Sequence, residues 1–76
     1  MKNRIVFYVW WCTADENQDG IHHKSVALPN VDVAQLEANS KWKHNDFVSI
    51  DKVVEVYADN AWRQQDGTET EVIEVL

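Results

Sequence analysis

The apolar run over residues 5–12 constrains the fold more than any other part of the chain. The run reads Ile-Val-Phe-Tyr-Val-Trp-Trp-Cys, and β-branched and aromatic residues favour a pleated strand. Successive strand side chains point to opposite faces. One face then carries Ile5, Phe7, Val9 and Trp11, and the other carries Val6, Tyr8, Trp10 and Cys12. Both faces are apolar, which is typical of a strand covered on both sides.

The length of the chain makes that double apolar surface difficult to bury. Its 76 residues fit one domain, residues 1–76, and a chain this small buries only about 60% of its unfolded surface. The single cysteine, Cys12, cannot form an internal disulfide. The apolar run is also far short of the roughly 20 residues that cross a bilayer, and no stretch resembles a secretion signal. We therefore predict a cytoplasmic protein that associates through one face of this strand.

The first half of the chain predicts a hairpin followed by a short helix. Residues 4–13 form the first strand, and Asp19-Gly20 is a turn signal. Residues 21–28 alternate loosely, which predicts a second strand antiparallel to the first. Pro29 ends that strand, and Asn30 can cap a short helix over residues 31–40.

Residues 50–65 carry the clearest helical period. Val53, Val56, Tyr57 and Ala61 recur at helical spacing. Ser49 can cap this helix, and Gly67 lies just beyond its end. The alternative is a strand over residues 52–62, because Val-Val-Glu-Val-Tyr is β-prone, paired with the tail through Asp66-Gly67. We favour the helix.

These elements predict a small single domain of the α+β class. Residues 70–76 form the last strand, so the order is β-β-α-α-β. The expected architecture is a three-stranded antiparallel sheet covered by one long and one short helix.

The charge of the chain narrows the class of partner. Seven basic and 13 acidic residues give a net charge of −6, which disfavours direct binding to nucleic acid or to an anionic membrane. The acid is concentrated in the last third of the chain. The predicted acidic surface comprises Glu55, Asp59, Glu69, Glu71 and Glu74. Such a row of carboxylates can imitate phosphates and attract a basic, nucleic-acid-binding protein.

Aromatic side chains are the candidate anchors of an interface. Four tryptophans are many for a chain of this size, and Trp and Tyr dominate binding hot spots. The candidates are Tyr8, Trp10, Trp42 and Trp62. The competing interpretation is that Trp42 and Trp62 close the ends of a small core.

Motifs for catalysis or metal binding are weak. Residues 15–20 match the start of a calcium loop, but position 12 of that loop is Val26, where a bidentate glutamate is required. His22, His23, His44 and Cys12 lack metal-ligand spacing. Cys12 ends an apolar run, a poor setting for a thiolate nucleophile. We expect no enzyme activity, no metal and no cofactor.

Two functions from different classes follow. The first is an acidic protein-binding module, an inhibitor of a nucleic-acid-handling host enzyme that combines an acidic surface with Trp anchors. Its size and acidity resemble those of short phage and mobile-element inhibitors. The second is a structural homodimer that packs through the Tyr8/Trp10 face, with no separate ligand. A third, weaker hypothesis is a domain regulated by calcium at residues 15–20.

Overall fold

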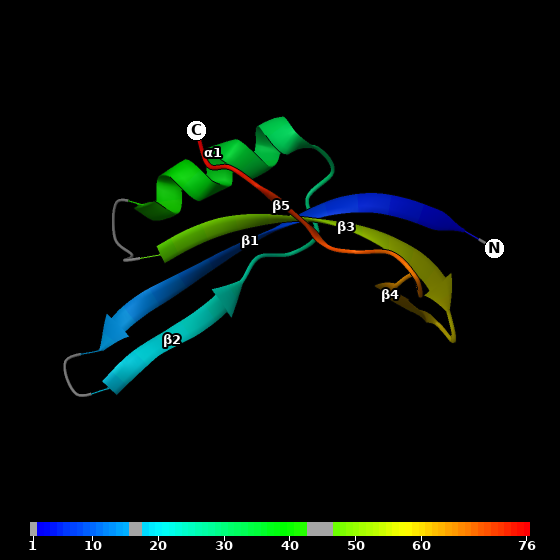
Figure 1. The fold of residues 1–76 in the computed structure, drawn as a ribbon, viewed down its shortest axis with the longest axis horizontal. Helices are drawn as coiled ribbons and strands as arrows, with labels where there is room; N and C mark the ends of the chain where they lie inside the picture. The colour runs from blue at the N-terminus through cyan, green and yellow to red at the C-terminus, as the bar shows by residue number, and fades with distance from the viewer. Residues whose placement is uncertain (1, 16–17, 43–46) are drawn as a thin grey trace.

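The computed structural model describes the chain outside residues 1, 16–17 and 43–46. Five strands and one helix lie in the described part (Figure 1): β1 Asn3–Asp15, β2 Gln18–Lys24, α1 Val31–Trp42, β3 Phe47–Ala58, β4 Ala61–Gln64 and β5 Glu71–Ile73. The sheet is antiparallel with the order β2-β1-β3-β4, and β5 also pairs with β3. Over the described residues, no helix has the length and apolar character needed to cross a membrane.

The predicted three-stranded sheet covered by two helices is wrong. Residues 50–65 are not a helix: they belong to β3 and β4, which form a hairpin. The hairpin turns at Asp59 and Asn60, whose φ angles are 53° and 63°. Asp and Asn tolerate this left-handed conformation better than most residues, and two consecutive such residues suit a hairpin turn.

The strand alternative for residues 52–62 describes this region better, but its connection to the tail is wrong. The chain reaches the tail only after β4, and β5 then pairs with β3 at Ile50–Lys52. The predicted helix cap at Ser49 is also wrong, because Ser49 is a strand residue opposite Trp10. Gly67 lies in the turn between β4 and β5 instead of ending a helix.

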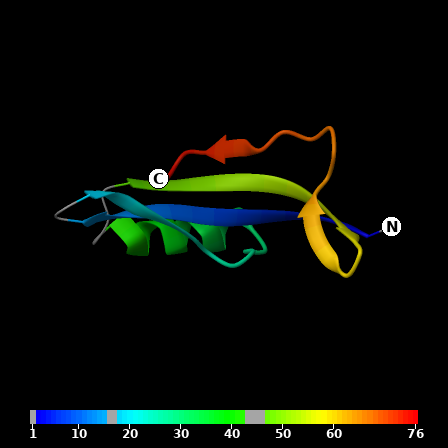
Figure 2. The same ribbon diagram turned by 90° about the horizontal axis from the view of Figure 1, so that it is seen from below.

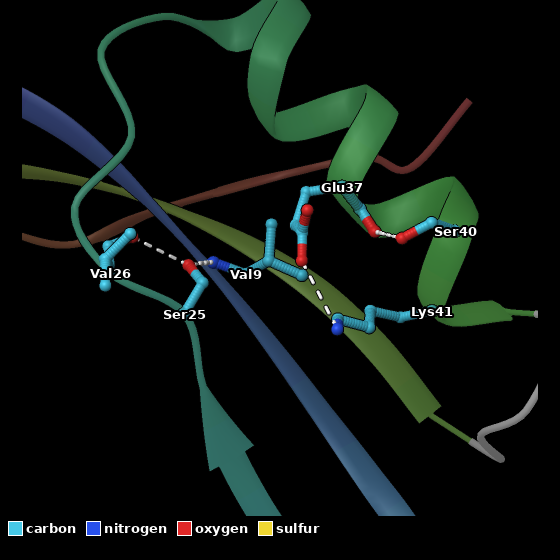
Figure 3. Close-up of polar contacts among 6 residues, drawn as sticks. All are labelled: Val9, Ser25, Val26, Glu37, Ser40 and Lys41. Carbon is cyan, nitrogen blue, oxygen red and sulfur yellow. Dashed lines mark hydrogen bonds and ion pairs between the residues drawn. The ribbon is translucent and has the colours of Figure 1, made fainter.

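The predicted antiparallel hairpin of the first two strands is confirmed, although β2 ends at Lys24. Beyond β2, the chain still follows β1. The Ser25 hydroxyl accepts a hydrogen bond from the Val9 amide at 2.9 Å and donates one to the Val26 carbonyl at 2.8 Å (Figure 3). Phe7 and Leu28 then exchange two backbone hydrogen bonds. Most of this edge of β1 is therefore hydrogen-bonded.

The helix α1 covers one face of the sheet, and its N-terminal cap is confirmed. The Asn30 side-chain oxygen accepts from the Val33 amide at 2.9 Å. The small side chains of Ala34 and Ala38 are fully buried and let the helix approach β1 and β3 closely. The buried core comprises Phe7, Val9, Ala34, Ala38, Val48 and Ile50. Beside this core, Glu37 and Lys41 of α1 form an ion pair at 3.3 Å (Figure 3), and the Lys41 ammonium lies 4.3 Å from the Trp11 ring centre.

The C-terminal segment is attached to the helix. The Gln35 side-chain amide donates to the Glu74 carbonyl at 2.7 Å, and its oxygen accepts from the Leu76 amide at 2.9 Å. Figure 1 shows the chain ending beside α1 after crossing β3. Ile73 and Val75 pack against the helix-side core. These contacts place the tail at the edge of the layer formed by α1 and the sheet.

The face of the sheet opposite α1 has its own small buried cluster. Val6 and Val53 are directly paired across β1 and β3 and are 5% and 7% exposed, and Glu55 is 6% exposed. In β3, burial therefore changes faces: Val48 and Ile50 point toward α1, whereas Val53 and Glu55 point away from it. Figure 2 shows the β3–β4 hairpin curling away from the plane of β1 and β3. Trp62 and Gln64 of β4 lie beside Val53 and Glu55 on this second face.

Candidate functional site

A hollow with a cavity volume of about 280 Å³ lies on the sheet face away from α1. Four strands and the loop after β4 line it: Tyr8 and Trp10 of β1, Lys24 of β2, Asp51, Val53 and Glu55 of β3, Trp62, Arg63 and Gln64 of β4, and Thr70. The alternation of β1 places Tyr8 and Trp10 on this face, because Phe7 and Val9 face the helix. The hollow combines aromatic rings with charged groups of both signs.

Glu55 is the polar centre of this face. The Arg4 guanidinium donates to Glu55 Oε1 from Nε and from a terminal nitrogen, each at 2.8 Å. The Tyr8 hydroxyl donates to Glu55 Oε2 at 2.6 Å. The register explains these contacts, because Arg4 is directly opposite Glu55 across β1 and β3. A nearly buried carboxylate is thus neutralised by charge-assisted hydrogen bonds that fix the Tyr8 ring in place.

Two cations of the chain lie over the aromatic rings. Arg4 Cζ lies 4.1 Å from the centre of the Trp62 ring, and Tyr57 contacts Trp62 edge-on with centroids 5.3 Å apart. Lys24 Nζ lies 4.1 Å from the Tyr8 ring centre and 5.5 Å from that of Trp10. Both distances fall within the range of cation–π attraction. The rings of this face are therefore oriented so that their electron-rich surfaces accept positive charge.

The environment of Tyr8 raises the pKa of its hydroxyl above the usual 10.0. Burial is the first cause, because it disfavours the phenolate, and the hydrogen bond to Glu55 and the negative charge of Glu55 act in the same direction. Arg4 opposes them, because its positive charge favours the phenolate. The net direction indicates that Tyr8 stays a hydrogen-bond donor at neutral pH.

We expect Tyr8 to titrate above its usual pKa and folding stability to fall from pH 10.0 upward. In that range the unfolded chain releases the Tyr8 proton more readily than the folded chain. The unfolded state therefore binds fewer protons, and stability decreases as pH rises. Ultraviolet difference titration of a Tyr57→Phe variant reports Tyr8 alone. Adding Glu55→Gln should lower the Tyr8 pKa, and an unchanged titration would contradict this assignment.

The structure gathers four of the nine residues predicted to bind a partner. Tyr8, Trp10, Glu55 and Trp62 line the hollow. The other five lie elsewhere: Trp42 at the end of α1, Asp59 in the β3–β4 turn, Glu69 in the loop after β4, Glu71 in β5, and Glu74 in the tail beside α1. Three of the four predicted aromatic anchors thus converge on one site, whereas four of the five predicted acidic residues lie elsewhere along the chain.

Two of the five predicted acidic residues are paired within the chain. Glu55 is bound by Arg4, as described above. Glu71 lies 3.7 Å from the Lys52 ammonium. Their charge is therefore partly neutralised. Asp59, Glu69 and Glu74 are the exposed carboxylates of the predicted acidic surface that form no ion pair among the described residues.

Sequence reasoning missed the polar residues that join the aromatic rings into a site. A helix over residues 50–65 would have Asp51 in its first turn, whereas Asp51 lies opposite Tyr8 in β3. Lys24 lies opposite Trp10 in β2. The hairpin register could have identified Lys24, because the β1 and β2 faces were already separable by alternation. Asp51 and Arg4 required β3 to be recognised as a strand.

The candidate metal ligands do not converge. His22 lies opposite Cys12 across β1 and β2, whereas His23 stacks on Trp11 at 5.5 Å on the other face. The described residues contain no group of three or more His, Cys, Asp or Glu side chains that could hold a metal ion. The side chains of residues 15–20 and the whole of His44 lie outside the described residues.

No family model matches the chain, and neither a curated protein nor a solved structure is significantly similar to it.

Proposed function

We propose that this protein is a protein-binding module whose partner docks on the sheet face away from α1. The observation that carries this proposal is the hollow of about 280 Å³, lined by Tyr8, Trp10 and Trp62. These are the side-chain types that dominate binding hot spots, and here they surround a concave surface. The hollow is partly open to solvent, which fits a protruding side chain of a protein better than a small molecule that must be enclosed.

The charge of the chain favours a basic partner. In this proposal the two proteins meet in the cytoplasm. A net charge of −6 steers a positively charged protein toward the module. A nucleic-acid-handling enzyme has such a surface, and inhibition of such an enzyme is one form of this function. Binding is therefore expected to weaken as salt concentration rises. An affinity that is equal at low and high salt would contradict the electrostatic part of the proposal.

A homodimer through the Tyr8/Trp10 face is the competing function. Isologous pairing would bring two copies of the same charged face together. The charged groups of this face are of both signs, but each copy carries a net charge of −6. The like charges oppose this pairing, so we favour a different protein as the partner.

The test compares tryptophans on the two faces of the sheet. In a pull-down from cells of the source organism, quantified by mass spectrometry, we expect a protein that wild type and Trp42→Ala retain and Trp10→Ala loses. Trp42 is a suitable control because it lies on α1, which packs on the opposite face. A partner lost only with Trp42→Ala would move the interface to the helix side. Sedimentation tests the competitor: a dimer that Trp10→Ala dissociates would replace the proposal.

A further inference from the structure

The rings of the hollow already hold a positively charged side chain of the protein itself. Lys24 is exposed, yet its ammonium lies 4.1 Å from the Tyr8 ring centre and 5.5 Å from that of Trp10. Its side chain comes from the neighbouring strand β2, directly opposite Trp10. The geometry of these two rings is therefore compatible with a cation. Within the described part of the chain, the rings are the only groups that hold this exposed ammonium, so a competitor can replace it.

A carboxylate that forms no ion pair with the described residues lies next to these rings. Asp51 is half-buried, lines the hollow and is directly opposite Tyr8 across β1 and β3. Among the described residues, it forms no hydrogen bond or ion pair. Its neighbour Glu55 is different, because Arg4 and Tyr8 already occupy that carboxylate. Asp51 thus provides the free negative charge of the site.

A half-buried carboxylate beside aromatic rings is suited to a basic side chain. The rings attract the cation through their faces, and the carboxylate supplies a charge-assisted hydrogen bond. The net charge of −6 acts at longer range in the same direction. An acidic ligand could contact Lys24 and Arg63 but would meet Asp51 and the overall negative charge. Within the lining, Lys24 and Arg63 are matched by Asp51 and Glu55, so the negative net charge of the chain decides in favour of a cation.

We propose that the hollow binds a lysine or arginine side chain from an extended basic segment of the partner. The cation lies against the Tyr8 and Trp10 rings in place of the Lys24 ammonium and pairs with the Asp51 carboxylate. Trp62 forms the opposite wall, where Arg4 fixes it by stacking at 4.1 Å. This inference rests on the proposed function and names the chemistry of its partner.

A tetralysine peptide with blocked ends is the probe, and the indole N–H signals of the protein are the readout in NMR titrations. We expect the Trp10 and Trp62 signals to shift, while Trp11 and Trp42, which are on the helix side, change little. Asp51→Asn should weaken binding about fivefold, because a half-buried ion pair is lost. Glu74→Gln removes the same charge from the exposed tail and should change affinity less than about twofold.

The second half of the test uses Lys24, the lysine of the protein itself that lies over the rings. Lys24→Ala removes the competing cation and should strengthen tetralysine binding by about twofold or more. Lys2→Ala removes the same charge from an exposed position near the start of β1 and should have a smaller effect. If the Lys24 ammonium competes with the ligand, Lys24→Ala should strengthen binding more than Lys2→Ala does. A general gain in negative charge would strengthen binding equally in both variants.

Several results would overturn the inference. Equal effects of Asp51→Asn and Glu74→Gln on affinity would show that tetralysine binds only by nonspecific charge attraction. Shifts of Trp10 and Trp62 on addition of a tetraglutamate peptide, lost in Lys24→Ala, would assign the hollow to an anionic ligand. A partner captured through Trp10 in the pull-down together with no tetralysine binding would refute this inference and leave the proposed function intact. Capture that is independent of Trp10 would refute both.

Discussion

Replacing Ile50 by alanine is expected to lower the free energy of unfolding by about 3 kcal/mol, because a fully buried side chain leaves a cavity in a close-packed core. Ile50 is 0% exposed, lies directly opposite Val9 across β1 and β3, and belongs to the core that α1 covers. A domain of this length is stabilised by only roughly 4–11 kcal/mol in total. The variant should therefore unfold at markedly lower denaturant concentration in equilibrium experiments followed by tryptophan fluorescence and circular dichroism.

Leu36→Ala is the matched control for this measurement. Leu36 lies on the outer side of α1 and is 73% exposed, so its truncation should change stability by less than about 0.5 kcal/mol. A loss for Ile50→Ala as small as that for Leu36→Ala would mean that α1 does not pack on this sheet face in solution. The comparison therefore tests the assignment of the helix to one face, on which the location of the hollow on the other face depends.

The first strand could be predicted because the β-propensity of its residues and the alternation of its side chains indicate the same structure. Residues 5–12 are β-prone, and their alternation separates Phe7 and Val9 from Tyr8 and Trp10. In the structure the first pair faces α1 and the second lines the hollow. The expectation that the fold covers only one face well follows from this alternation and from the small number of residues available to form a second layer.

The third strand could not be recognised because its burial changes faces halfway along. Val48 and Ile50 are buried under α1, whereas Val53 and Glu55 are buried on the opposite side. The resulting spacing of apolar residues has no period of two over its whole length and imitates a helical stripe. The β-branched residues of this segment favour a strand instead, and the segment forms one because it pairs with β1 and β4.

The candidate site was only half predictable for the same reason. Tyr8 and Trp10 needed only the alternation of one strand. The pairing of Arg4 with Glu55, and the placement of Asp51 beside Tyr8, depend on the register between β1 and β3. A helix over residues 50–65 leaves no register to deduce. The predicted acidic surface treated Glu55 as solvent-exposed, whereas strand pairing buries it against a guanidinium.

Arg4→Met is expected to lower the free energy of unfolding by about 2 kcal/mol, because it leaves the Glu55 carboxylate buried without its cation. The Glu55 side chain is 8% exposed and the Arg4 side chain is 34% exposed, which places the expected loss below that for a fully buried pair. Methionine retains an apolar stem that can still pack on Trp62. Equilibrium unfolding at neutral pH measures the loss.

Lys52→Met is the matched control, because it breaks an ion pair that is largely exposed. Lys52 and Glu71 lie 3.7 Å apart with side chains 38% and 64% exposed. Loss of this pair should cost less than about 0.5 kcal/mol. Equal small losses for Lys52→Met and Arg4→Met would show that the Arg4–Glu55 pair contributes no more than a surface contact.

A double variant separates the cost of a stranded charge from the cost of lost packing. When Glu55→Leu is added to Arg4→Met, no charge is left buried, and apolar side chains replace the ion pair. Replacing a buried ion pair by apolar residues is often neutral, so the double variant should lie within about 1 kcal/mol of wild type. If it is less stable than Arg4→Met alone, Glu55 stabilises the fold through a contact other than the Arg4 pair, namely the hydrogen bond from the Tyr8 hydroxyl. Glu55 would then do more than satisfy its own burial, and its bond to Tyr8 would help to hold the concave face together.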